Sequence, residues 1–414
     1  MRGTLRRTRM KDWFEVIRET CPICHKSGGC LLHSDGNRVV CIRVESKTVF
    51  SKKMTSWLHY LKEPVKVSKD VEDYIPDSPK APIEQLNAVY GAMLENTSLQ
   101  DNHYDHLNGE KRAMQDSEIK LREYRSFPTK AWNTVKAMQH HVDSDAFNGT
   151  PGLFTNKFGW TIAGAPGILI PYRNEKNQVI GFQIRVDNPG LKTVLEGTFK
   201  DRVTAEIIEK PNKVQVKING EVFEEKYLSA GERIDIMTNG NYGSVSLKKG
   251  QRYFWLSSAN KENGTGAGNP LPVHIAVPVS QLKQWEVGEV HQAESVWITE
   301  GALKADIAVE HMERLYKSGQ IQDLEKTPTF IGLPGVATWF NVLEVLKGMN
   351  TKMVTLAYDM DMLSNHDVLR AMKDFMVHLK GEGYKVRMAM WNEQDGKGID
   401  DMFLNSKFPQ VKEF

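Results

Sequence analysis

The sequence predicts a multidomain α/β protein: an N-terminal zinc ribbon, a helical plus β subdomain with a β-rich insertion, and a C-terminal parallel α/β sheet. Three observations predict this fold class. All cysteines of the 414-residue chain lie between Cys21 and Cys41, apolar residues alternate within 197–250, and strand-like and helix-like segments alternate from 295 to 403. Alternating strands and helices are typical of a parallel sheet with helices on both faces.

The chain is long enough for two or three domains, and changes in composition indicate where they meet. Residues 61–84 hold four prolines among charged residues, which is typical of a linker. Within 197–250, alternating valines precede Asn219-Gly220, the strongest short signal for a β-hairpin. We therefore expect a zinc-binding module at 1–60, a linker at 61–84, a core subdomain at 85–290 with the β-rich insertion at about 197–250, and an α/β domain at 291–414.

The composition excludes several classes of protein. Hydrophobic residues make up 40% and charged residues 26% of the chain, as in a globular protein. No apolar run approaches the ~18 residues that span a bilayer, and the basic N-terminus lacks the apolar segment of a secretory signal. We expect a cytoplasmic protein without a membrane partner. The net charge of +2 means that nucleic-acid binding needs locally clustered cations.

The clustered cysteines are best explained by a metal site. In a chain without a secretion signal, such a cluster indicates metal rather than disulfides. A C-x₂-C knuckle followed by two further cysteines supplies the tetrahedral ligands of structural zinc. Nearby His25 and His33 could each replace one cysteine, but four thiolates leave no cysteine over and are the softer ligands. The expected zinc ligands are Cys21, Cys24, Cys30 and Cys41.

Acidic residues follow three of the predicted parallel strands near the C-terminus. Glu300 follows VWIT, Asp359 and Asp361 follow TLAY, and Asp400 follows KVRMAMW after a short loop. The carboxyl ends of parallel strands meet at one edge of the sheet, where open α/β sheets bind ligands. Crowded carboxylates repel one another, so a divalent cation is their natural partner. The pattern therefore predicts a magnesium site.

The order of these motifs resembles a known family. VWITEGALKADIA, FIGLPG, TLAYDMD and GKGIDD resemble, in this order, the TOPRIM domain of primases, topoisomerases and some nucleases. Upstream, GILIPYRNEKNQVIGFQIR and RYFWLSS resemble the segments that precede TOPRIM in bacterial replicative primases. The N-terminal zinc module completes the same domain order. The similarity is closer still to the primase-like TOPRIM proteins of phages and integrated mobile elements.

The resemblance implies a function. It implies a DNA primase, a DNA-directed RNA polymerase that makes short RNA primers by magnesium-dependent nucleotidyl transfer in DNA replication. Its partners would be a single-stranded DNA template, nucleoside triphosphates and a replicative helicase acting in trans. Two alternatives stay open: a TOPRIM nuclease, and a non-catalytic DNA-binding accessory protein of a mobile element. A topoisomerase is disfavoured because the chain leaves little room for a separate tyrosine-bearing gate.

The resemblance also implies roles for individual residues. Glu300, Asp359 and Asp361 would bind Mg²⁺, with Asp400 as a further catalytic acid; alternatively, Glu300 would be the general base on the primer 3′-hydroxyl. The residues implied to bind nucleic acid or nucleotide are Arg173, Arg185, Lys304 and Lys397.

Three features depart from the family pattern. Bacterial primases carry an acid four residues after the TOPRIM glutamate, where this chain has Lys304, and an acid where it has Gly398. The glycine that usually follows the Asp-x-Asp motif is also missing. These departures bear on how many metal ions the centre would hold.

Overall fold

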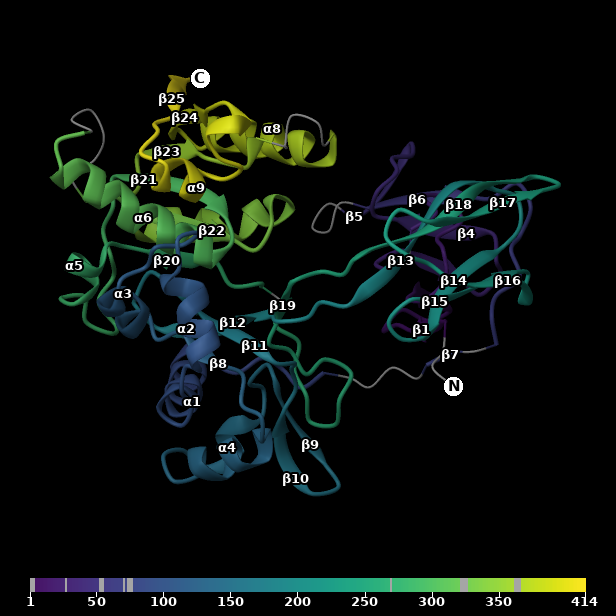
Figure 1. Ribbon diagram of the computed structural model, residues 1–414, viewed down its shortest axis with the longest axis horizontal. Helices are drawn as coiled ribbons and strands as arrows, with labels where there is room; N and C mark the ends of the chain where they lie inside the picture. Colours follow the sequence, from purple (N-terminus) through teal and green to yellow (C-terminus); the bar gives the residue numbers. More distant parts are fainter. Residues whose placement is uncertain are drawn as a thin grey trace. The chain divides into compact units, whose positions relative to one another are not determined.

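The computed structural model describes residues 4–26, 28–51, 56–69, 71–72, 77–268, 270–320, 327–360 and 366–414. The chain forms two compact units (Figure 1). The N-terminal unit combines residues 1–75 with 188–252, and the main unit combines 76–187 with 253–414. Each unit is therefore built from two separate stretches of chain. Among the described helices, none is long and apolar enough to cross a membrane.

The first stretch of the N-terminal unit is a β module around the cysteines, as predicted. Its seven strands form one sheet in the order β5-β6-β4-β3-β2-β1-β7. Leu5, Val16, Leu32 and Val39 bury their side chains beside the cysteine sulfurs, so the metal ligands lie within the core of the module. The strands are β1 (Leu5–Arg7), β2 (Trp13–Val16), β3 (Leu31–His33), β4 (Arg38–Cys41), β5 (Thr48–Ser51), β6 (Ser56–Tyr60) and β7 (Val71–Glu72).

The second stretch is the β-rich insertion, which forms two three-stranded sheets in the orders β13-β18-β17 and β14-β15-β16. The alternating Val214 and Val216 are fully buried, and Asn219 and Gly220 turn the chain between two strands with φ of 53° and 92°. The hairpin signal in the sequence is therefore confirmed. The strands are β13 (Leu191–Phe199), β14 (Val203–Glu209), β15 (Lys213–Ile218), β16 (Glu221–Tyr227), β17 (Arg233–Thr238) and β18 (Asn241–Lys249).

The insertion packs against the cysteine module. Arg202 forms an ion pair with Glu19, whose side chain is only 4% exposed, and donates a hydrogen bond to Thr4 Oγ1 at 3.1 Å. The Thr20 hydroxyl donates to the carbonyl oxygen of Val203 at 3.0 Å. These contacts join residues more than 180 positions apart in the sequence. The sequence analysis placed the insertion within the core subdomain, whereas the structure groups it with the cysteine module.

We expect Arg202→Ala to destabilise the N-terminal unit by roughly 2 kcal/mol, because it leaves the Glu19 carboxylate buried without its charge partner. This is below the ~3–5 kcal/mol of a fully buried pair, since Arg202 itself keeps contact with water. Denaturant unfolding, together with the rate at which a chelator removes bound zinc, measures the effect. Arg233→Ala is the matched control, because the Arg233–Asp235 pair in the same insertion is exposed. Equal behaviour of the two variants would contradict a stabilising Arg202–Glu19 contact.

The first stretch of the main unit contains helices and three strands of an antiparallel sheet, which β19 of the second stretch completes in the order β19-β12-β11-β8. The segment GILIPYRNEKNQVIGFQIR lies in the antiparallel β11–β12 hairpin, which is almost wholly buried. The elements are α1 (Ile83–Glu95), α2 (Asp101–Asn108), α3 (Asp116–Leu121), β8 (Arg125–Ser126), α4 (Ala131–Met138), η1 (Ser144–Phe147), β9 (Leu153–Asn156), β10 (Gly159–Ile162), β11 (Gly167–Arg173), β12 (Val179–Val186) and β19 (Tyr253–Trp255).

The C-terminal part is a six-stranded sheet in the order β20-β22-β21-β23-β24-β25. The four inner strands are parallel, as the strand–helix alternation predicts, and the two edge strands are antiparallel. The strands are β20 (His274–Ala276), β21 (Ser295–Glu300), β22 (Phe330–Leu333), β23 (Met353–Leu356), β24 (Lys385–Met390) and β25 (Gln410–Glu413).

Helices cover both faces of this sheet, so the predicted α/β architecture is confirmed. Trp297 and Phe330 pack on one face against Met312 and Phe403. Ile298 packs on the other face in a cluster with Phe375. The first face carries α6 (Ala302–Lys317) and α9 (Ile399–Leu404). The second carries α5 (Val279–Leu282), η2 (Val336–Val342), α7 (Leu343–Gly348) and α8 (His366–Gly381), while the short η4 (Glu393–Asp395) precedes α9.

Candidate functional site

The four cysteines form a compact cluster in the N-terminal unit. Their sulfur atoms all lie within 4.8 Å of one another, with 3.7 Å between Cys24 and Cys30 and 3.9 Å between Cys30 and Cys41. A tetrahedral zinc ion with Zn–S bonds of about 2.3 Å needs sulfur–sulfur distances of about 3.8 Å. The sulfurs therefore already have the spacing of a four-thiolate zinc site.

The surroundings of the cluster favour thiolates. The backbone amide of Ile23 donates to the Cys21 sulfur at 3.4 Å, and those of Arg43 and Val44 donate to Cys41 at 3.4 and 3.3 Å. The Arg43 guanidinium also donates to the sulfurs of Cys24 and Cys30 at 3.5 and 3.6 Å. Mutual hydrogen bonds among the four thiols lower the pKa of Cys24 and bring that of Cys41 to about 6, and together with burial they raise the pKa of Cys21 and Cys30. Donated hydrogen bonds and a nearby cation stabilise the charged sulfur that zinc requires.

Neither of the two nearby histidines belongs to the cluster. His33 contacts Asp35 at 3.0 Å and the Arg38 guanidinium at 2.8 Å. The ring of His25 instead stands edge-on to Phe199 of the insertion, with ring centroids 6.1 Å apart. The four-cysteine ligand set is therefore the one that the structure assembles.

We expect Cys24→Ser to lower the zinc content from about one ion per chain and to destabilise the N-terminal unit, because metal binding contributes directly to folding of small zinc modules. The main unit should keep its own unfolding transition, since it has separate hydrophobic cores. Elemental analysis and calorimetry measure the two effects. His25→Ala is the control and should keep its zinc. Full zinc occupancy in the Cys24→Ser protein would rule out this ligand set.

The acidic residues lie near the carboxyl ends of the inner parallel strands of the main unit. Glu300 is the last residue of β21, Asp359 follows β23 by three positions, and Asp400 lies in the first turn of α9. Ile298 of β21 pairs with Leu356 of β23, so the ends of these two strands are aligned. Asp361 lies outside the described residues.

Lys304 lies at the centre of this group. It is in the first turn of α6, and its ammonium forms an ion pair with Asp359. Burial alone would lower the pKa of Lys304, but the carboxylates of Asp359, Asp400 and Glu300 outweigh burial and raise it. All three described acids therefore lie within electrostatic range of one buried ammonium.

Asp400 is the most deeply buried of these acids, with 3% of its surface exposed. One of its oxygens accepts a hydrogen bond from Arg112 at 3.1 Å, and the other has no hydrogen-bond partner in the described part of the chain. Burial is the main cause that raises its pKa to about 6. A buried carboxylate oxygen without a partner is an available ligand for a cation.

Glu300 lies beside a second buried polar group. Burial and the Glu300 carboxylate raise the pKa of Tyr358 well above its usual value, and the Tyr358 hydroxyl has no hydrogen-bond partner among the described residues. Gly301 follows with a φ of 82°, in the left-handed region, which lets the chain turn sharply from β21 into α6. The turn brings Glu300 and Lys304 to the same edge of the sheet.

The other expected binding residues lie in different surroundings. Arg173 is buried at the end of β11, where it pairs with Glu123 and donates to Asn177 Oδ1 at 3.1 Å. Arg185 is half-buried on β12 between Ile168 and Tyr253 on the neighbouring strands. Lys397 is exposed just before α9. The structure thus brings Lys304 to the acids, and it places Arg173 within a separate ion-paired cluster.

Asp306, the acid nearest to Lys304 in the sequence of α6, has a structural environment. Its side chain is 2% exposed and pairs with Arg122; the Tyr124 hydroxyl donates to it at 2.5 Å, and His274 Nε2 lies at 3.1 Å. Burial alone would raise the pKa of Asp306, but Arg122 and His274 outweigh burial and lower it. Arg122, Tyr124 and His274 all lie outside α6, so their contacts with Asp306 hold this helix against the rest of the main unit.

We expect Asp306→Asn to destabilise the main unit by about 3–5 kcal/mol, because it leaves a buried guanidinium with one fewer charge partner. Denaturant unfolding measures the loss. Asp374→Asn on the exposed side of α8 is the control and should change stability by less than ~0.5 kcal/mol. Unchanged stability of Asp306→Asn would show that this network does not hold α6 in place.

Sequence reasoning missed Arg112 and Tyr358. Arg112 lies between α2 and α3, 288 positions before the carboxylate that it contacts, and nothing in its local sequence marks it. Tyr358 directly precedes Asp359, and its lack of a hydrogen-bond partner becomes visible only once its burial is known.

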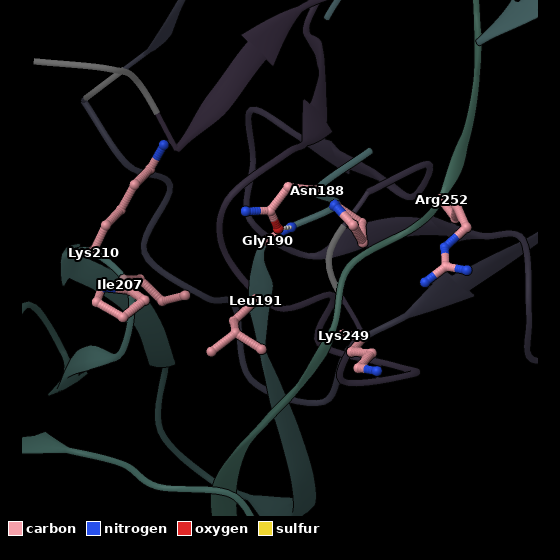
Figure 2. Close-up of a pocket in the computed structure, with 9 residues that line it drawn as sticks. Asn188, Gly190, Leu191, Ile207, Lys210, Lys249 and Arg252 are labelled. Carbon is pink, nitrogen blue, oxygen red and sulfur yellow. Dashed lines mark hydrogen bonds between the residues drawn. The ribbon is translucent and has the colours of Figure 1, made fainter. Parts of the chain in front are cut away.

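The N-terminal unit also contains an open groove of about 810 Å³ (Figure 2). Three of its lining residues are cations, Lys210, Lys249 and Arg252, and none of the described lining residues is acidic. Leu191 and Ile207 give it an apolar floor. Cations beside an apolar surface suit the phosphates and bases of a single-stranded nucleic acid.

The chain was compared with family models, curated proteins and solved structures. Residues 284–409, which contain all the described acids of the centre, match the family model "Domain of unknown function (DUF3854)". No curated protein matches the chain. Over nearly its whole length the chain is structurally similar to bacterial primases, in their zinc-binding and RNA polymerase domains.

Three of the solved structures that match the chain are primase domains. The zinc-binding and RNA polymerase domains of Aquifex aeolicus primase match 99% of this chain and 81% of theirs, at 12% identity and a TM-score of 0.43. The RNA polymerase domain of Mycobacterium tuberculosis DnaG was solved in complex with a double-stranded DNA oligomer with an overhang. The match covers 79% of this chain and 80% of that one, at 11% identity and a TM-score of 0.43. The match to the catalytic core of E. coli primase covers 78% of this chain and 77% of that one, at 12% identity and a TM-score of 0.37. These similarities concern the fold and not the activity.

Proposed function

We propose that this chain is a DNA primase, a DNA-directed RNA polymerase that makes short RNA primers on single-stranded DNA. The observation that carries the proposal is the convergence of Asp359, Asp400 and Lys304, with Glu300 in electrostatic range, at the carboxyl edge of a parallel sheet. The sheet follows a four-cysteine module in the same chain. This combination is the domain order of the primases that the motifs resemble.

The donor set at this edge suits magnesium. Hard divalent cations bind carboxylate oxygens, and the centre offers several together with an unpartnered, buried oxygen on Asp400. Glu300 and Asp359 would hold the ion, and the Asp-x-Asp motif adds Asp361 to this set. When bound, Mg²⁺ would neutralise the charge that develops on a triphosphate during transfer.

The residues of the chain have defined tasks in nucleotidyl transfer. The primer 3′-hydroxyl attacks the α-phosphorus of the incoming nucleoside triphosphate, and pyrophosphate leaves. In the alternative assignment, the Glu300 carboxylate would accept the proton of the attacking hydroxyl instead of holding the ion. Exposed Lys397 and the cationic groove of the N-terminal unit would contact triphosphate and template phosphates, respectively. A replicative helicase acting in trans would supply the unwound template.

We expect Asp359→Asn and Asp361→Asn to lower primer synthesis by at least ~100-fold, the usual effect of removing one group that stabilises transition-state charge. Both proteins should stay folded, because Asp400 and Glu300 still stabilise the Lys304 ammonium when Asp359 is neutral, and the hydrophobic cores of the main unit are unchanged. The measurement is extension by labelled nucleoside triphosphates on single-stranded DNA, with thermal stability recorded with and without Mg²⁺. Mg²⁺ should raise the melting temperature of the parent and leave those of the variants nearly unchanged.

Asp374→Asn is the control and should synthesise primers at the parent rate. A parent protein that cuts DNA and never extends a primer would replace the primase assignment with a TOPRIM nuclease. A parent that binds single strands and does neither would identify a non-catalytic accessory protein.

A further inference from the structure

The cationic groove of the N-terminal unit is lined by residues of the insertion alone, all of them within 188–252. At one edge of the groove, Leu191 of β13 pairs with Lys249 of β18. The Thr193 hydroxyl donates a hydrogen bond to the Ala205 carbonyl oxygen at 2.9 Å, which links β13 to β14. The groove is therefore complete within one unit, on strands that are held to one another.

The cations of this groove differ from the other cations around them. Lys210, Lys249 and Arg252 are exposed, and none of them forms an ion pair with a residue that the structure describes. Three other lysines of the insertion pair with glutamates on neighbouring strands, at 3.7, 3.4 and 3.0 Å: Lys213, Lys217 and Lys248. The positive charges that lack a protein partner among the described residues thus gather at the groove.

The floor of the groove is apolar and partly open. Leu191 is 39% exposed and does not belong to the hydrophobic cluster that the described residues of the insertion form, whereas Ile207 packs at the edge of that cluster. Figure 2 shows Lys210 on one side of Leu191 and both Lys249 and Arg252 on the other. Cations spread across an apolar floor suit a chain of several phosphates better than a single anion, which needs cations that converge on one point.

These features favour a single strand over a duplex. The bases of a single strand are free to turn a flat face onto an apolar surface while its phosphates contact nearby cations. In a duplex the bases are paired and stacked, so their faces are not available to Leu191 or Ile207. The apolar floor would then have no partner.

The arginines beside the last cysteine are used within the protein. Arg38 Nε donates to Asp35 Oδ2 at 2.7 Å. The Arg43 guanidinium donates to the Gly28 carbonyl oxygen at 3.0 Å and to the Cys24 sulfur at 3.5 Å. The cations of the groove are therefore better placed than these two arginines to bind phosphates.

We propose that the insertion, and not the surface beside the cysteines, binds single-stranded DNA for the N-terminal unit. Phosphates contact Lys210, Lys249 and Arg252. An unstacked base covers Leu191 and Ile207. Contacts of this kind do not read the sequence of the strand. The inference deepens the proposed function, and it rests on that function where it takes the bound strand to be the template for primer synthesis.

The test measures binding of a fluorescently labelled single-stranded DNA to the zinc-loaded full chain, by anisotropy at several salt concentrations. The test variant combines three substitutions: Lys210→Ala, Lys249→Ala and Arg252→Ala. We expect it to bind at least ~10-fold more weakly at low salt, and the slope of log K against log salt to fall by roughly 2, since each phosphate contact of a single strand contributes about 0.7.

The matched control removes three charges from the paired lysines of the same insertion: Lys213→Ala, Lys217→Ala and Lys248→Ala. It should keep the affinity and the salt slope of the parent. Equal losses in the two triple variants would show that net charge alone matters and would overturn the proposal. Zinc content and melting temperature establish that each variant is folded. If the test variant loses its zinc, the single change Lys249→Glu replaces it and should also weaken binding.

An abasic strand of the same length tests the apolar floor. The parent should bind it more weakly than the strand with bases, and Leu191→Asn should reduce this difference. A difference that Leu191→Asn leaves unchanged would overturn the base contact. Tighter binding of a duplex of the same length, lost in the groove variant, would overturn the assignment to single strands.

Failure of the proposed function gives a different result. A parent that makes no primers, while the groove variant still loses strand binding, would refute the primase and leave the groove as a single-strand site. A groove variant that binds single strands as the parent does, while the parent makes primers, would refute the groove and leave the primase standing.

Discussion

The buried contact between Asp306 and Arg122 is the constraint on which the candidate site depends. Asp306 and Glu310 lie one turn apart on α6 and both pair with Arg122, which also donates to the Val277 carbonyl at 2.8 Å. These contacts fix both the rotation of α6 about its axis and its position along that axis relative to Arg122 and Val277. Because Lys304 is in the first turn of the same helix, its ammonium reaches Asp359 only when this network is formed.

Much of the fold could be predicted because its signals are local. Alternating strands and helices identified the parallel sheet, an Asn-Gly pair identified a hairpin, and four closely spaced cysteines identified a metal site. The antiparallel edge strands β20 and β25 were not predicted, because the direction of an edge strand depends on how the chain returns to the sheet. The packing of the insertion on the cysteine module was not predicted either, since it depends on Arg202 reaching Glu19 across 183 positions.

The candidate site shows the same division. The positions of the acids follow from strand ends, so Glu300, Asp359 and Asp400 were found from the sequence. The partners of Lys304 and Asp400 could not be found, because an ion pair is set by tertiary distance. The ion pair of Arg173 with Glu123 could not be found from the sequence either, because the two residues lie 50 positions apart.

The N-terminal unit combines two separate stretches of chain, and this limits how far its cysteine module can move from the main unit. The chain passes between the two units three times, at 75–76, 187–188 and 252–253. A module on a single flexible linker explores a large volume and can reach the active site of another molecule. Here two further connections, at 187–188 and 252–253, join the insertion in the same unit to the main unit. The shortest of the three connections therefore limits how far the cysteine module can move. The length of the proline-containing linker alone therefore does not set how far the two units can separate.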